Sequence, residues 1–586
     1  MGHAAPILAI FALVILLHWQ LVLNINTHVI GRPFEDAFEV LWQLDWMQRA
    51  VFELQTNPFY TPDIYHPVGW HTASAAQPSW YFLLLSPVTY LFGATLTYNL
   101  LHLLLLGGIG CGIYLFVNEL TDDRWASMVV GLILPSSANI QMRLGGHTHT
   151  IIATFFLCFA YLFCYRALLR KNSSNRLIIA SGLFLAASIL GHWYFLFIAT
   201  LPMLAFLVAP TAGMVDWSHR LGRLTVIGLI ALACIGPFAY LSWSAQSAMF
   251  GETAVTSLIA SDSTGISFDA LFRPQWWHPL WRDAADERLV FLGGESRPVT
   301  LGYTAVFLAV CSLFLSQFDK SRLFWGIGVI ALIFGLGTSL HWAGQRLEIN
   351  SSGVLSWLND WLLYELALPE GRGALPLPGA VFYNYLPFYD GIRVWARFVL
   401  PLIWAVSILA GLGLAALRQR MRYGTAILAV CLALVIFEGW LTPYLFFTDV
   451  RDNHRPEVNA WLATVPNDAA IIEYPRWIDK IAMYNQGFHQ HPIVNGYMSY
   501  APRFLQEAGQ AVESSWPTAA AMPFLYEWDV EYLLLSGSDS DAFQNEVLPS
   551  IIAIDGLCLT ESFVEGAMGF KNSYIFTVVP EGQLCE

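Results

Sequence analysis

The chain has 586 residues, of which 56% are hydrophobic and only 12% are charged, and its formal net charge at pH 7 is −14. A soluble protein of this length divides into several domains and carries roughly twice this share of charged residues. The composition therefore excludes an ordinary soluble protein, and the excess of acid argues against nucleic-acid binding.

Apolar runs long enough to cross the hydrocarbon layer, about 20 residues each, recur through the first three quarters of the chain. The first covers residues 5–24 and lacks both a basic N-terminal region and a small-residue cleavage site, which indicates a transmembrane helix rather than a removed signal peptide. The further spans that we expect are residues 96–118, 125–140, 150–168, 177–191, 193–210, 223–243, 300–317, 322–341, 398–416 and 423–446. The sequence thus predicts a polytopic α-helical membrane protein with about eleven transmembrane helices.

Short loops between alternate spans are rich in Lys and Arg, namely residues 166–176, 218–223, 319–322 and 418–422. Such loops stay in the cytoplasm, so we expect a plasma (inner) membrane protein with a cytoplasmic N-terminus. The segments expected on the extracytoplasmic side are residues 25–95, 141–149, 244–299, 342–397 and everything after 446.

Residues 78–93 (PSWYFLLLSPVTYLFG) are apolar but short, and they contain Pro87. Counting them as a span would move every later basic loop to the outside. We therefore expect a helix that lies on, or dips into, the outer face of the membrane.

The last part of the chain has a different composition, with 18 acidic against 6 basic residues after residue 450. Strands are expected at 469–475, 530–537 and 572–580, and helices at 454–465 and 500–514. We predict a transmembrane domain over residues 1–446 and a small extracytoplasmic α/β domain over residues 447–586. Acid on a solvated surface generally serves solubility.

Six of the eight cysteines lie in apolar runs, where a thiol behaves as a small hydrophobic group. Cys558 and Cys585 lie in the polar C-terminal region, where an extracytoplasmic location permits a disulfide but does not require one. No Cys/His cluster has zinc-finger spacing, so a structural zinc site is not expected.

Four carboxylates follow the first span closely, in the segment FEDAFEVLWQLDWMQRA. Asp36 and Glu39 have the spacing of a capping box for a helix over residues 37–53, with acid in place of Ser or Thr. The alternative is that Asp36 belongs to a functional site. Glu39 and Asp45 lie further along the helix and are expected on its solvated face.

The acid pair, the amphipathic helix and NPFYTPDIYHPVGW (57–70) together resemble the first external loop of the GT-C membrane glycosyltransferases, distantly including the oligosaccharyltransferase catalytic subunit. Further stretches are similar to uncharacterised prokaryotic GT-C proteins: RLGGHTHT (143–150), RPVTLGY (297–303), LPFYDGIRVWARF (386–398), and a C-terminal domain with EYP and HQHPIVNGY (489–497). The resemblance runs over nearly the whole chain.

The resemblance implies an enzyme that transfers a sugar, with inversion, from a polyprenyl-phosphate-linked donor to a lipid, glycan or protein acceptor outside the membrane. Its catalytic carboxylate corresponds to Asp36, with Glu35 beside it. Such a group takes the proton of the acceptor hydroxyl as an oxocarbenium-like centre forms. Partial desolvation at the membrane surface raises the pKa of a carboxylate toward a useful value.

The lipid phosphate that leaves needs its charge stabilised, and arginine binds phosphate oxygens in two places. Arg393 and Arg397, one helical turn apart, are the first candidates, and Arg143 is the third. The alternative is that Arg393 and Arg397 are snorkelling anchors beside Trp395.

His147 and His149 stand where the oligosaccharyltransferases carry acids that help to bind a divalent cation. We expect His147 to be a polar partner of the site and no cofactor to be required. The alternative is a Mg²⁺ or Mn²⁺ site formed by Asp36, His147 and His149. Tyr65 and His66 are candidates for lining a sugar cleft, although aromatic residues are also common at membrane interfaces.

Two other classes of function fit the composition. A transporter or flippase is disfavoured because the spans lack a series of mid-membrane acids or bases and a pair of Gly/Pro-broken helices in related halves. A non-catalytic assembly subunit would tolerate the loss of Asp36, so that substitution separates it from an enzyme.

Overall fold

The computed structural model describes the chain from residue 3 onward. Its gaps are residues 34, 75–77, 171–172, 210–215, 251–256, 275–277, 279, 282–298, 316–317, 367, 387–388, 393, 441–446, 498–500, 567–568, 581–582, 584 and 586. Arg393 and part of the motif 297–303 therefore lie outside the described residues.

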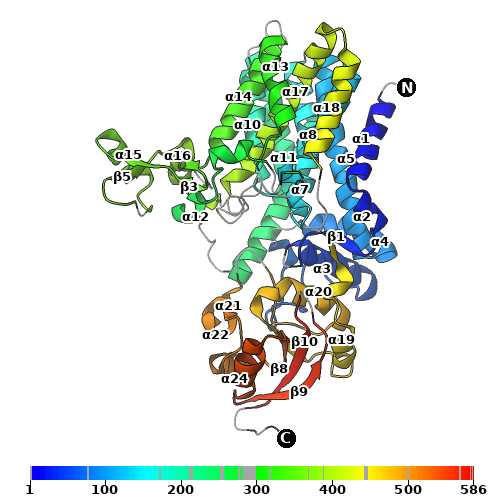
Figure 1. Ribbon diagram of the computed structural model, residues 1–586, viewed down its shortest axis with the longest axis vertical. Coiled ribbons are helices and arrows are strands. Elements are labelled where there is room, and N and C mark those ends of the chain that lie inside the picture. Colours follow the sequence, from blue (N-terminus) through cyan, green and yellow to red (C-terminus); the bar gives the residue numbers. More distant parts are fainter. Residues whose placement is uncertain are drawn as a thin grey trace.

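Apolar helices form an elongated bundle in the first three quarters of the chain (Figure 1). Its members are α1 (Ala4–Leu17), α2 (Trp19–Leu23), α5 (Ala94–Thr121), α6 (Arg124–Gly131), α8 (Thr148–Leu169), α9 (Asn175–Gly191), α10 (Phe195–Val208), α11 (Trp217–Phe250), α13 (Tyr303–Leu315), α14 (Phe318–Gly335), α17 (Val399–Arg420) and α18 (Gly424–Glu438). Each predicted span overlaps one of these helices, except that the first, 5–24, overlaps two. Within the described ranges, four stretches are long and apolar enough to cross a membrane: α5, α8, most of α11, and Trp395–Arg420.

The predicted span 125–140 differs most from the structure. Helix α6 ends at Gly131, a run of turns follows, and α7 (Ala138–Arg143) is a separate short helix. Pro135 lies between the two helices, and a proline lacks the N–H that a continuing helix needs. As a result Arg143 and the following loop are brought to one end of the bundle.

Helix α17 forms the centre of the bundle and is buried along nearly its whole length. It packs against α5, α6, α13 and α14, and its Trp404 lies among Phe116, Tyr161 and Phe324. Peripheral helices instead expose large apolar side chains, such as Leu8, Leu232 and Phe314. An exposed apolar surface of this kind suits lipid rather than water.

The two ends of the bundle differ in their charges. At the end away from the C-terminal region, the predicted basic loops supply arginines to the bundle. Arg166 donates to Glu119 at 2.8 Å, Arg170 also pairs with Glu119, and Arg418 pairs with Asp123. The turn between α17 and α18 lies at this end (Figure 1).

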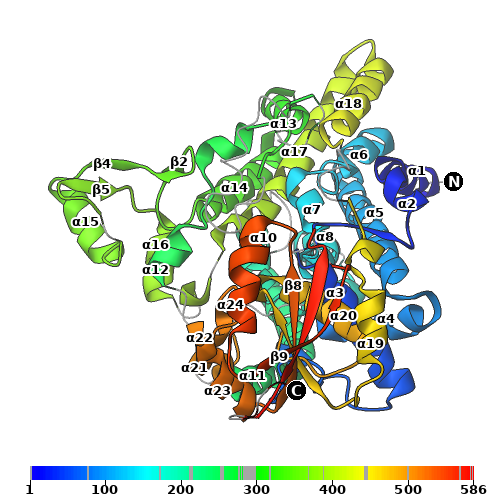
Figure 2. The ribbon, with the colours of Figure 1, turned by 60° about the horizontal axis from the view of Figure 1, so that its bottom comes forward.

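The opposite end carries α3 (Ala37–Gln48), which continues as a π-helical turn over Arg49–Glu53, and α4 (Ser79–Phe92). Helix α4, which contains Pro87, corresponds to the predicted surface helix. It packs beside α3 and the start of α5 (Figure 2). Its side chains Leu84, Leu91 and Phe92 are exposed.

An arm projects sideways from this end of the bundle (Figure 1). It contains α12 (Leu258–Asp262), β2 (His341–Trp342), β3 (Gln345–Arg346), β4 (Glu348–Asn350), α15 (Val354–Leu362), β5 (Arg372–Ala374) and α16 (Pro378–Tyr385). The strands form two short antiparallel pairs, β2 with β3 and β4 with β5.

The C-terminal region contains a four-stranded sheet in the order β7-β8-β10-β9, with β7 parallel to β8 and the other neighbours antiparallel. Its strands are β7 (Ala470–Tyr474), β8 (Val530–Gly537), β9 (Leu557–Phe563) and β10 (Asn572–Val578), and its helices are α19 (Pro456–Leu462), α20 (Asp479–His489), α21 (Arg503–Ala508), α22 (Gln510–Glu513), α23 (Met522–Glu527) and α24 (Leu548–Ile552). Three strands lie where the sequence predicts them. The fourth, β9, is an edge strand with mostly exposed residues, so its sequence lacks the apolar pattern of a core strand. Cys558 in β9 forms a disulfide with Cys585.

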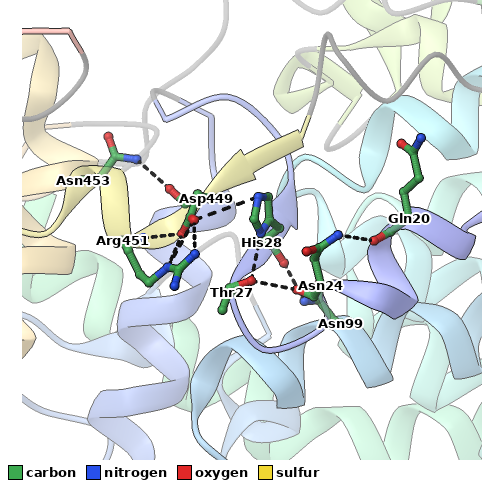
Figure 3. A network of polar contacts seen from close by, with 8 residues as sticks. All are labelled: Gln20, Asn24, Thr27, His28, Asn99, Asp449, Arg451 and Asn453. Carbon is green, nitrogen blue, oxygen red and sulfur yellow. Dashed lines mark hydrogen bonds and ion pairs between the residues drawn. The ribbon is translucent and has the colours of Figure 1, made fainter.

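The C-terminal region is attached to the first loop of the bundle through backbone and side-chain contacts. Strand β1 (His28–Ile30) pairs antiparallel with β6 (Phe447–Asp449). In Figure 3, Asp449 lies between His28, at 4.0 Å, and Arg451, while Asn99 of α5 donates to the carbonyl of His28 at 2.8 Å. The start of the C-terminal region is thereby fixed beside the segment that leads into α3.

Candidate functional site

Asp36 lies at the junction between the bundle and the C-terminal region. Within the described part of the chain, its carboxylate makes no capping hydrogen bond to α3, although Asp36 is the residue that precedes the helix. Lys480 of α20 donates to its Oδ1 at 2.6 Å, and Nδ1 of His147 lies 3.7 Å from its Oδ2. The capping interpretation is therefore wrong for this side chain, which meets groups from two distant segments instead.

Glu35 faces a different neighbour from Asp36. Its carboxylate accepts a hydrogen bond from the backbone N–H of Arg32 at 3.1 Å. It also packs so closely on Gly145 that a Cβ there would lie 2.3 Å from its Oε2. Glu35 thus stabilises the loop that presents Asp36.

The expectation that Glu39 lies on a solvated helix face is wrong. Glu39 is only 6% exposed, because α4, α5 and α20 cover α3, and it accepts a hydrogen bond from Gln43 at 2.8 Å. Burial, followed by the negative charge of Asp36, raises the pKa of Glu39 well above its ordinary value, against the opposing effect of Lys480. Burial likewise raises the pKa of Asp45, the other acid expected on that face.

Two glycines let the second loop approach Asp36 closely. Gly146 has φ +116°, and a Cβ at this position would lie 2.2 Å from the backbone of Asp36 and Ala37. The backbone of this loop lies directly against the backbone of Asp36, so a side chain larger than that of glycine does not fit in the Gly-Gly pair of RLGGHTHT.

A row of imidazole and guanidinium groups leads away from Asp36. The ring of His147 lies 5.2 Å from that of His149, which lies 4.5 Å from that of His192. Arg397 donates to Nε2 of His192 at 2.6 Å and stacks over Tyr194, with its guanidinium carbon 4.6 Å from the ring centre.

His192 is uncharged at neutral pH. Burial, and then the positive charge of Arg397, lowers its pKa well below the ordinary value, with smaller effects from His149 and Arg143. Arg143 is 2% exposed and its Nε donates to Asn139 at 3.1 Å. Both Arg143 and Arg397 are buried at this end of the bundle, so neither extends over the surface as a snorkelling anchor does.

Tyr65 and His66 lie where the first loop meets the C-terminal region. The ring of Tyr65 packs on Gly496, and burial, followed by the charges of Asp479 and Glu39, raises its pKa well above the ordinary value. His66 forms a hydrogen bond through Nε2 with the carbonyl oxygen of Trp528 at 2.8 Å. Their role in a sugar cleft remains a prediction.

Sequence reasoning missed three members of this cluster: His192, Lys480 and Tyr497. His192 occupies the short connection between α9 and α10, which carries no motif. Lys480 lies 444 residues after Asp36 in the chain, and its Nζ lies 3.8 Å from the ring centre of Tyr497. Lys480 meets Asp36 only because α20 packs against α3 (Figure 2).

The side chains around Asp36 do not fit a divalent cation. Among the described residues, no group of three or more His, Cys, Asp or Glu side chains is arranged to hold a metal ion. Of the three ligands named from the sequence, Asp36 has the ammonium group of Lys480 on one oxygen, and the ring of His149 lies closer to that of His192 than to that of His147. A dication at Asp36 would be repelled by that ammonium group.

Comparison with known proteins gives structural likeness only. No protein-family model matches the sequence, and no curated protein matches it. The mycobacterial arabinofuranosyltransferase AftD is similar in structure with a TM-score of 0.54 and 13% identity, over 99% of this chain and 40% of that chain. The chain thus spans about two fifths of the length of AftD. The fold is GT-C-like.

Two further solved structures are similar over most of their length. ArnT from Cupriavidus metallidurans, bound to undecaprenyl phosphate, has a TM-score of 0.49 and 12% identity, over 98% of each chain. The oligosaccharyltransferase AglB from Archaeoglobus fulgidus has a TM-score of 0.47 and 11% identity, over 91% of this chain and 69% of that chain.

Proposed function

We propose that this protein is a membrane glycosyltransferase that moves a sugar from a polyprenyl-phosphate-linked donor to an acceptor on the extracytoplasmic side, with Asp36 as the general base. The observation that carries the proposal is the meeting of Asp36 with a buried row of cationic and imidazole groups at one end of an apolar bundle with a GT-C-like fold.

The charge distribution supports the side of the membrane. The arginine-rich ends of α8 and α17 lie away from Asp36, and such basic ends face the cytoplasm. The end with Asp36 and the acidic C-terminal region is then extracytoplasmic. The disulfide between Cys558 and Cys585 agrees with an oxidising compartment.

In the proposed reaction, the acceptor oxygen attacks the anomeric carbon of the donor while the bond from that carbon to the phosphate oxygen breaks. The acceptor proton passes to the carboxylate of Asp36, and the polyprenyl phosphate leaves with the bonding electrons. Arg397 and Arg143 stabilise the charge that develops on the phosphate. A single displacement inverts the anomeric centre.

The test is sugar transfer by the purified protein in lipid, offered a panel of radiolabelled polyprenyl-phosphate sugars. Asp36→Asn is expected to lower the rate by about 10²–10⁴-fold, because it removes the base. Asp45→Asn, on the same helix, is the matched control and retains transfer. Undiminished transfer by folded Asp36→Asn would remove the proposed base, and movement of the donor across the membrane without any transfer would indicate a flippase.

A further inference from the structure

Lys480 places a fixed positive charge on the proposed base. Its Nζ lies 2.6 Å from Oδ1 of Asp36, and the two side chains are only 11% and 17% exposed. The same Nζ lies over the ring of Tyr497 at 3.8 Å, an arrangement that favours a cation. Lys480 is thus held between an anion and an aromatic face.

The ammonium form of Lys480 is the one that exists at neutral pH. Burial works against its charge, but the charge of Asp36 and the hydrogen bond with Asp36, together with the neighbouring Tyr497, outweigh burial and raise the pKa of Lys480 above its ordinary value. Glu39, the next carboxyl group along α3, acts in the same direction.

The position of Lys480 depends on how the C-terminal region docks. Nε1 of Trp42 in α3 donates to Gln486 in α20 at 2.7 Å, and Asn485 in α20 donates to the carbonyl of Asn453 at 2.9 Å. The β1–β6 pairing fixes the chain just before Asn453. Helix α20 therefore brings Lys480 to Asp36 only when the C-terminal region is seated on the bundle.

An ammonium group and a divalent cation would compete for the same carboxylate. Both compensate the negative charge of the carboxylate. In a poorly solvated site the ammonium group and the dication repel each other too strongly to bind the same carboxylate together. The other oxygen of Asp36 faces an imidazole rather than a second carboxylate, because Nδ1 of His147 lies 3.7 Å from it.

We propose that Lys480 is a positioning residue that takes the place of a divalent cation at Asp36, so that the reaction needs no added metal and requires the docked C-terminal region. This inference rests on the proposed function where sugar transfer is measured, but the measurement of metal binding does not depend on activity.

The first experiment uses the full-length wild-type protein in lipid nanodiscs. Transfer is expected to be unchanged after EDTA treatment, and titration with Mn²⁺, followed by electron paramagnetic resonance, is expected to show no stoichiometric site that depends on Asp36. Loss of transfer in EDTA, or a stoichiometric Mn²⁺ site that Asp36→Asn abolishes, would overturn the inference. Absence of transfer with every donor would instead count against the proposed function, while the Mn²⁺ titration would still decide the inference.

The second experiment compares Lys480→Met, Lys480→Arg and the control Lys571→Met, which removes an exposed lysine paired with Asp539 at 3.1 Å. Without its ammonium partner the carboxylate of Asp36 is no longer held in place, so kcat should fall by about 10²-fold in Lys480→Met while KM for the donor changes little. Lys480→Arg should keep most of the wild-type kcat. An unchanged kcat in a folded Lys480→Met protein overturns the inference, and the wild-type metal measurements decide it if this variant does not fold.

Discussion

Two ion pairs that involve the C-terminal region differ in their exposure to water. Arg455 and Glu473 lie 2.7 Å apart in the core of the region, and both side chains are 0% exposed. Lys480 and Asp36 lie 2.6 Å apart at its junction with the bundle, and both side chains keep some exposure. The core pair joins residues 18 positions apart, whereas the junction pair joins residues 444 positions apart.

The comparison separates a charge that stabilises folding from a charge that serves a site. A fully buried pair has lost its hydration, so removing one partner leaves an unpaired charge in the interior. The junction pair keeps some contact with water, so loss of one partner leaves a charge that is still partly hydrated. We therefore expect substitutions in the core to act on stability and substitutions at the junction to act on the reaction.

The largest effect is expected for Glu473→Gln, which leaves Arg455 buried without its carboxylate. Loss of one partner of such a pair costs about 3–5 kcal/mol of stability. Thermal unfolding of the protein in nanodiscs measures this loss. The double variant Arg455→Met with Glu473→Leu should recover much of the loss, and a Glu473→Gln protein as stable as the wild type would contradict the distinction between core and junction.

The next largest effect is expected for Arg397→Gln, on kcat/KM for the donor. Arg397 is 6% exposed and holds His192 at 2.6 Å. Loss of one group that stabilises developing charge lowers the rate by about 10²-fold, so kcat/KM for the donor should fall by that factor while thermal unfolding changes little. Arg273→Gln, which removes a partly exposed arginine paired with Asp269, is the control. Normal turnover of Arg397→Gln at limiting donor would exclude Arg397 from the site.

The smallest effect concerns Asp479, which adjoins Lys480 but lies inside the C-terminal region. Burial, against the opposing charge of Arg476, raises the pKa of Asp479 to about 7. The folded protein then binds this proton more tightly than the unfolded chain, so stability falls as the pH rises from about 4 to about 7. Asp479→Asn should flatten this slope, as measured by unfolding temperatures at pH 5 and pH 8. The exposed Asp541→Asn is the control, and an unchanged slope in Asp479→Asn would contradict the assignment.

Sequence reasoning succeeded where the signal was local. Apolar runs of the right length predicted the helices of the bundle, and β-rich segments predicted β7, β8 and β10. The expectation that His147 is a polar partner of Asp36 agrees with the distance of 3.7 Å between its Nδ1 and that carboxylate. The same reasoning placed Glu39 in solvent, because nothing in the sequence of α3 indicates that α4, α5 and α20 cover it.

The sequence by itself determined an apolar bundle, its charged ends and an acidic C-terminal region, because hydrophobicity and charge act through composition over a short window of chain. Only the tertiary structure decided which groups meet Asp36. Lys480 and His192 come from segments without a motif of their own. The docking of α20 places Lys480 against Asp36, and the turn after α9 places His192 against Arg397. Electrostatic partnership falls off with distance in space rather than along the chain, and for that reason no local pattern could reveal it.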